Sequence, residues 1–161
     1  MKKRNLLMSR SVMVLILIFL VSTPLYAENV RGVTDDTMKI GVIIDLSGPF
    51  TGATVPIKEA IAVHFKHINE MGGIHGRKVK LIIEDDRYSI PLAIAAFKKL
   101  VYKDEIFATF GPSQTGASVA LSSKIEKQGL VTFPCSHSER MVTPHKRHIF
   151  MPGASYADQV N

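Results

Sequence analysis

The sequence has no tryptophan, and its single cysteine, Cys135, excludes an internal disulfide. It has no P-loop and no Gly-x-Gly-x-x-Gly pattern, the two glycine-rich signatures of phosphate and dinucleotide binding. It also lacks low-complexity segments and internal repeats at a fixed period. The chain is therefore neither a disulfide scaffold nor a repeat protein, and nothing in it indicates a nucleotide-binding enzyme.

Long apolar runs are missing as well. The longest, Val12–Val21, is well short of the ~20 residues that a membrane-spanning helix needs. A basic start precedes it, and Ser22–Pro24 interrupt the apolar pattern before Ala27. This order predicts a secretory signal peptide over residues 1–27, cleaved near Ala27. The alternative, a membrane anchor, is disfavoured by the short run.

Positive charge is concentrated in this leader. The whole chain carries +6, and residues 1–27 contain four bases and no acid, so residues 28–161 carry about +2. A nearly neutral remainder gives no argument for a nucleic-acid partner. Cys135 lies far from the leader, so no thiol stands where a lipid would be attached after cleavage. An exported protein without an anchor is retained by an outer membrane, and we expect a periplasmic location.

After the leader, short apolar runs alternate with amphipathic stretches. The first amphipathic stretch should bury Ile57, Ile61, Phe65 and Ile68 on one helical face. We predict strands at Met38–Ile44, Lys78–Glu84, Ile106–Phe110 and Leu130–Phe133, with His148–Met151 as a candidate fifth, and helices at about Val55–Met71, from Ser89 onward and at about Gly116–Lys127. Strict alternation predicts an α/β fold, a doubly wound parallel sheet with helices on both faces.

In such a sheet, ligands bind outside the carboxyl ends of the strands. The best candidate there is the loop Gly111–Thr115, where a tight turn opens a helix whose free N–H groups favour a carboxylate or a phosphate. Ser113 or Thr115 can add a hydroxyl donor, or one of them can simply cap the helix, and spacing alone leaves both interpretations open. Ser136 and Ser138, after the fourth strand, would face the same crevice.

Metal and phosphate chemistry find weaker support. His64 and His67 are three apart on a predicted helix, but neither His75 nor an evident acidic or cysteine residue completes a ligand set. We expect solvated surface histidines and no metal. The pair Asp85–Asp86 after a strand is similar to the acidic pair of a phosphorylated receiver domain, but export argues against that function because phosphate donors are cytoplasmic.

A cysteine nucleophile is also disfavoured. Cys135 and His137 are close in sequence, but neighbouring side chains in a strand or loop usually diverge, whereas a catalytic pair must meet in space. We therefore expect a protein without enzymatic activity and without a cofactor.

The chain resembles the amino-terminal lobe of the leucine/isoleucine/valine-binding proteins. The resemblance rests on several motifs in the right order and spacing: Val33–Thr37, Lys39–Gly41, Asp45–Pro49, Ile68–Gly76 and Gly111–Thr115. These proteins are solute receptors of branched-chain amino acid ABC transporters and have the type I periplasmic binding fold. The match runs from about residue 33 to residue 155, and it is more specific for the family than for the ligand.

The resemblance implies a set of ligand-binding residues. Thr115 stands where the family usually has a serine whose hydroxyl binds the ligand's carboxylate. Ser136 and Ser138 match loop residues that bind the α-carboxylate and ammonium groups through backbone and hydroxyls. Ala53 stands where the family usually has a large side chain near the ligand, and Phe50 can compensate for that loss.

The resemblance also implies a missing part. The family has a second lobe of similar architecture, which normally supplies an acidic group for the ligand's ammonium and closes the cleft by a hinge motion. This chain stops at Tyr156–Asn161, near the crossover. We therefore expect residues 28–161 to be the amino-terminal ligand-binding lobe of a fragment or a truncated chain, with weak binding or none in the absence of the second lobe.

Three hypotheses about the function of the chain can be tested. The first is the substrate-binding component of an ABC transporter for branched-chain or related amino acids, working with an inner-membrane permease. The second is a ligand-sensing module of the same fold for amides or urea, feeding a signalling or uptake partner. The third, an exported hydrolase using Cys135 or Ser136, requires a base that the sequence does not identify.

Overall fold

The computed structural model describes residues 30–160, so the predicted leader lies outside the described residues. A parallel sheet has the strand order β2-β1-β3-β4. Its strands are β1 (Thr37–Ile44), β2 (Lys78–Asp85), β3 (Ala108–Phe110) and β4 (Val131–Phe133), connected by the helices α2 (Thr51–Glu70), α3 (Ile90–Tyr102) and α4 (Thr115–Gln128) and followed by the 3-10 helix η1 (Glu139–Met141). The predicted α/β fold with a parallel sheet is confirmed.

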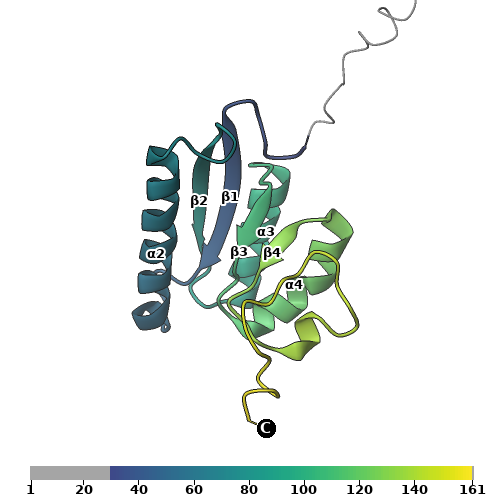
Figure 1. The fold of residues 1–161 in the computed structure, drawn as a ribbon. Coiled ribbons are helices and arrows are strands. Elements are labelled where there is room, and N and C mark those ends of the chain that lie inside the picture. Colours follow the sequence, from purple (N-terminus) through teal and green to yellow (C-terminus); the bar gives the residue numbers. More distant parts are fainter. Residues whose placement is uncertain (1–29, 161) are drawn as a thin grey trace, which may run out of the picture.

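The strand order explains the layers. β2 lies on one side of β1, and β3 and β4 lie on the other, so the direction of winding reverses between β1 and β3. Right-handed crossovers then place α2 on one face and α3 and α4 on the opposite face, an arrangement that Figure 1 shows. The larger core cluster lies on the α3 and α4 side and includes Ile43, Phe97, Leu100, Leu121 and Ile125.

β1 is apolar because both of its faces are covered. Ile43 belongs to the large cluster beneath α3 and α4, whereas Ile40 belongs to a smaller cluster with Val79, against which Phe65 of α2 packs. Within residues 30–160, no helix combines the length and the apolar character needed to cross a bilayer.

The start of α2 differs from the prediction. The helix begins at Thr51 rather than near Val55. The buried carboxylate of Asp45 accepts the N–H groups of Gly48 (2.6 Å) and Phe50 (2.8 Å), which order the chain before the apolar pattern begins. The apolar periodicity could not reveal this boundary because a contact from the end of β1 sets it.

Two further sequence predictions need correction. Ile57 is 40 % exposed rather than buried, while Ile61 is half-buried as expected. The candidate fifth strand is reduced to one parallel bridge between Thr132 and Ile149. This segment runs beside β4 for too short a distance to form a strand.

Candidate functional site

The carboxyl ends of β1 and β3 lie on either side of the point where the winding reverses, and α4 begins next to them. The loop from β3 to α4 starts with Gly111, which has φ +92°. A Cβ at this position would lie 2.0 Å from the carbonyl oxygen of Ile43. Glycine is therefore required for the loop to pass close to the end of β1 and deliver the start of α4 to the edge of the sheet.

The first turn of α4 has no side-chain cap. Its N-cap residue is Gln114, whose side chain makes no capping bond but donates from Nε2 to the carbonyl oxygen of Tyr88 (2.9 Å). Ser113 Oγ has no hydrogen-bond partner within the described part of the chain, and Thr115 Oγ1 is bound to Ser136. The capping alternative thus does not apply, and the N–H groups and positive dipole end of α4 favour an anion.

The structure brings together three of the predicted site residues at this helix start. Ser136 Oγ donates to Thr115 Oγ1 at 3.2 Å, and the N–H of Ser138 donates to Ser136 Oγ at 3.3 Å. Ser136 is fully buried, whereas Thr115 and Ser138 keep part of their surface exposed. We refer to Thr115, Ser136 and Ser138 as the hydroxyl cluster. Ser113, also predicted, contributes a buried hydroxyl in the same loop as Thr115.

Phe50, the remaining predicted residue, lies at the same edge of the sheet. The residue is 46 % exposed, and its ring packs against the ring of Tyr88, with centroids 5.3 Å apart and planes tilted by 41°. Tyr88 is in turn connected to α4 through the bond from Gln114. Sequence reasoning missed Tyr88, although an aromatic residue in the loop that follows a parallel strand was a signal that could have pointed to it.

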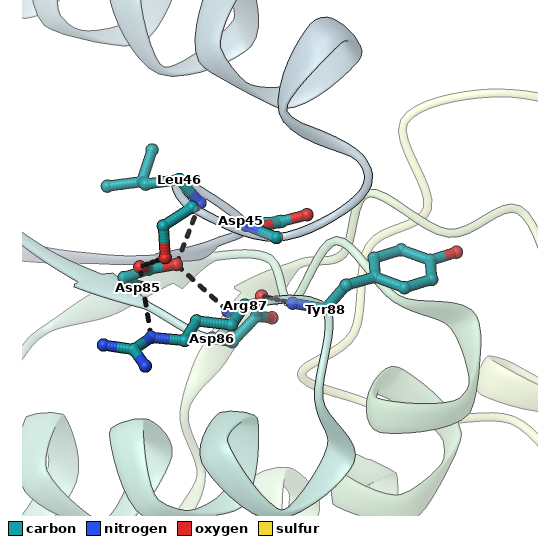
Figure 2. Close-up of polar contacts among 8 residues, drawn as sticks. Asp45, Leu46, Asp85, Asp86, Arg87 and Tyr88 are labelled. Atoms are coloured by element: carbon teal, nitrogen blue, oxygen red, sulfur yellow. Dashed lines mark hydrogen bonds and ion pairs between the residues drawn. The ribbon is translucent and has the colours of Figure 1, made fainter.

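The acidic residues at this edge hold the loops in place (Figure 2). Asp85 accepts the N–H of Leu46 (2.9 Å), the hydroxyl of Ser47 (2.5 Å) and the N–H of Arg87 (3.0 Å). Burial acts to raise the pKa of Asp85, but the hydrogen bonds from Ser47, Leu46 and Arg87 outweigh it and keep the pKa below its ordinary value. Asp85 therefore joins the loop after β1 to the turn after β2.

Asp86 behaves differently because it has no exposed surface. Its Oδ1 accepts the N–H of Tyr88 (3.0 Å), whereas its Oδ2 has no partner among residues 30–160. Burial raises the pKa of Asp86, and the nearby carboxylates of Asp45 and Asp85 add to the effect. Within the part of the chain that the structure describes, no group of three or more His, Cys, Asp or Glu residues could hold a metal ion.

Among residues 30–160, no hydrogen bond joins Cys135 to His137. The His137 ring lies 3.0 Å from the carbonyl oxygen of Ala154 through Nδ1 and packs beside Tyr156. Burial raises the pKa of the Cys135 thiol, and the charge of Asp86 raises it further. Both effects disfavour the thiolate that a cysteine nucleophile requires.

The three histidines considered as metal ligands, His64, His67 and His75, are exposed to solvent. The prediction of solvated surface histidines is confirmed.

A protein-family profile described as periplasmic binding protein matches residues 37–161. The chain belongs to the periplasmic binding protein family. This family consists of non-catalytic substrate-binding proteins of ABC transporters.

Curated relatives of this periplasmic binding protein are much longer. An amino acid binding protein of Pseudomonas aeruginosa is 28% identical over 106 residues, which cover 63% of this chain and 28% of that protein. The Leu/Ile/Val-binding protein BraC3 of Rhizobium johnstonii is 30% identical over 105 residues, covering 65% of this chain and 26% of BraC3. The chain thus spans less than a third of either relative.

Solved structures agree on the fold. A fatty acid ABC transporter substrate-binding protein from Thermomonospora curvata aligns with TM-score 0.74 and 23% identity, over 83% of this chain and 33% of that one. The branched-chain amino acid substrate-binding protein LivJ of Streptococcus pneumoniae, solved with isoleucine, aligns with TM-score 0.70 and 21% identity over 74% and 34%. The predicted family and the type I periplasmic binding fold are confirmed.

Proposed function

We propose that this protein captures a small α-amino acid, branched-chain or related, for an ABC transporter and does no chemistry on it. The observation that carries the proposal is the hydroxyl cluster (Thr115, Ser136, Ser138) at the uncapped start of α4. Relatives named as amino acid binding and Leu/Ile/Val-binding proteins support the ligand class.

The site suits a carboxylate for a physical reason. The hydroxyl of Thr115, which accepts the hydroxyl of Ser136, can donate to a carboxylate oxygen, and the N–H groups of the first turn of α4 add donors backed by the helix dipole. Hydrogen bonds to a charged group are shorter and stronger than neutral ones. Backbone carbonyls of the loop around Ser136 and Ser138 are acceptors for the ammonium group.

The place of action and the partners follow from the same proposal. The basic, apolar and small-residue order of residues 1–27 supports export to a periplasm, where the protein would deliver its solute to an inner-membrane permease. Residues 28–161 would form the amino-terminal lobe of the complete protein, and a second lobe would supply the acidic partner of the ammonium group.

Calorimetry on the complete protein, as its gene encodes it, tests the ligand class. We expect L-leucine, L-isoleucine and L-valine to bind, and acetamide and urea not to bind. Binding of amides or urea in place of amino acids would support the sensing alternative and contradict amino acid capture.

The variant Thr115→Val tests the site because it removes one hydroxyl with little change in volume. Loss of a hydrogen bond to a charged group costs about 1.5–3 kcal/mol, so we expect L-leucine to bind roughly 10- to 150-fold more weakly. Ser123→Ala, an exposed hydroxyl on α4, is the matched control and should bind as the wild type does. Equal affinity in Thr115→Val and Ser123→Ala would exclude Thr115 from the site.

A further inference from the structure

The turn after β2 has an unusual backbone. Arg87 (φ 49°) and Tyr88 (φ 57°) are consecutive non-glycine residues in the left-handed region. A side chain with a Cβ adopts this conformation at an energetic cost, and such residues persist where surrounding contacts hold them, often at ligand sites. The other non-glycine residues with positive φ among residues 30–160, His75 and Glu105, are isolated and lie outside the loops that follow the strands at this edge.

Three side chains hold the turn. Asp85 Oδ1 accepts the N–H of Arg87 at 3.0 Å, and Asp86 Oδ1 accepts the N–H of Tyr88 at 3.0 Å. From the opposite side, Gln114 Nε2 donates to the carbonyl oxygen of Tyr88 at 2.9 Å. The turn is therefore fixed both from β2 and from the N-cap of α4.

The result is a defined position for one aromatic ring. Figure 2 shows the Tyr88 ring and the Arg87 side chain pointing in opposite directions from the turn. The Tyr88 ring packs on Phe50, and both rings retain exposed surface. The Tyr88 hydroxyl makes no hydrogen bond among the residues that the structure describes. A partly exposed aromatic pair with a free hydroxyl offers both apolar area and a polar group to a ligand.

We propose that Tyr88, supported by Phe50, contacts the side chain of the bound solute and sets selectivity for a large apolar side chain, branched or aromatic. The inference rests on the proposed function, in which the carboxylate binds at the start of α4. Gln114 connects the two parts, because its side chain holds the Tyr88 backbone while its carbonyl oxygen accepts the N–H of Ser118 in the first turn of α4. Gln114 therefore connects the proposed carboxylate position to the ring pair of Tyr88 and Phe50.

The small residue at position 53 fits this assignment. Ala53 is exposed in the first turn of α2, and it leaves that part of the edge without a large side chain. The aromatic surface at the edge comes instead from Phe50 and Tyr88, on the loops after β1 and β2.

Calorimetry on the complete protein with L-alanine, L-leucine and L-phenylalanine tests the inference through the variant Tyr88→Asn. Asparagine tolerates the left-handed conformation, so the variant removes the ring without adding backbone strain. We expect about tenfold weaker binding of L-leucine and L-phenylalanine, and a change within about twofold for L-alanine. The melting temperature should stay the same or rise, which a purely structural role for the ring would not produce.

Two variants complete the design. Arg87→Asn relieves strain at the adjacent residue and keeps the ring, so it should bind the three amino acids in the same order of affinity as the wild type. Phe50→Ala should reduce the selectivity for L-leucine and L-phenylalanine over L-alanine, and it tests the inference even if Tyr88→Asn does not fold. An equal loss for all three amino acids, or no loss, in the ring-deleting variants would overturn the role of Tyr88. A wild type that binds none of the three would instead contradict the proposed function itself.

Discussion

At the scale of single residues, the carboxylates near the site separate into two kinds. Asp85 is saturated with hydrogen bonds that favour its charged form, and its pKa is lowered. Asp86, one position later, is buried with one oxygen unpartnered in the described chain, and its pKa is raised. Adjacent aspartates therefore have opposite effects on stability as the pH changes.

The raised pKa of Asp86 predicts the behaviour of Asp86→Asn. Ionisation of Asp86 costs more in the folded chain than in the unfolded chain. This cost is absent below the unfolded value near 3.8, grows as the pH rises through the raised folded pKa, and then stays constant. The amide can still accept the N–H of Tyr88, so the variant should gain stability relative to the wild type as the pH rises across this window. Urea unfolding from pH 4 to pH 8 measures the difference.

Asp158→Asn provides a control of opposite sign. Hydrogen bonds from Ser155 lower the pKa of Asp158, so its charged form stabilises the fold above the unfolded value, and this stabilisation is lost as the pH falls. The Asn variant should therefore lose stability relative to the wild type as the pH rises. A pH-independent difference for Asp86→Asn would show that burial of that charge does not affect folding.

At the scale of elements, α4 positions both the hydroxyl cluster and the segment after η1. Near its carboxyl end, Glu126 accepts the N–H groups of Arg147 (3.1 Å) and His148 (2.8 Å). Burial acts to raise the pKa of Glu126, but the hydrogen bonds from His148 and Arg147 outweigh it, and the pKa is lowered. This contact holds the segment beside β4, where the N–H of Phe150 donates to the carbonyl oxygen of Thr132 (2.9 Å).

Glu126→Gln tests that coupling. The neutral amide weakens charge-assisted bonds worth about 1.5–3 kcal/mol each, so the segment should open locally more often. We expect hydrogen exchange at the N–H groups of His148 and Phe150 to accelerate by roughly tenfold or more, with little change at the N–H groups of β1. Glu59→Gln, on the exposed side of α2, should change neither rate. Unaltered exchange at His148 in Glu126→Gln would contradict the coupling.

At the scale of the whole molecule, the fold could be predicted because local patterns agreed with the topology. β1 is apolar on both faces, and strict alternation with helices requires parallel strands. The convergence of Thr115 with Ser136 follows from the same logic, since the carboxyl ends of parallel strands meet at one edge. Their role in binding remains a prediction.

What the sequence could not predict depends on contacts between distant segments. The start of α2 at Thr51 is set by the carboxylate of Asp45, and the position of Tyr88 is set by a left-handed turn that Asp86 and Gln114 hold from different elements. The spacing of apolar residues along the sequence gives no information about such hydrogen bonds.

The central claim is that the start of α4 binds the carboxylate of an amino acid. A crystal structure of the complete protein with L-leucine tests it most directly. We predict both carboxylate oxygens within hydrogen-bond distance, about 2.7–3.2 Å, of donors from Thr115 and the first turn of α4, with the side chain directed toward Tyr88. Leucine bound elsewhere, or with its carboxylate turned away from α4, would contradict the account.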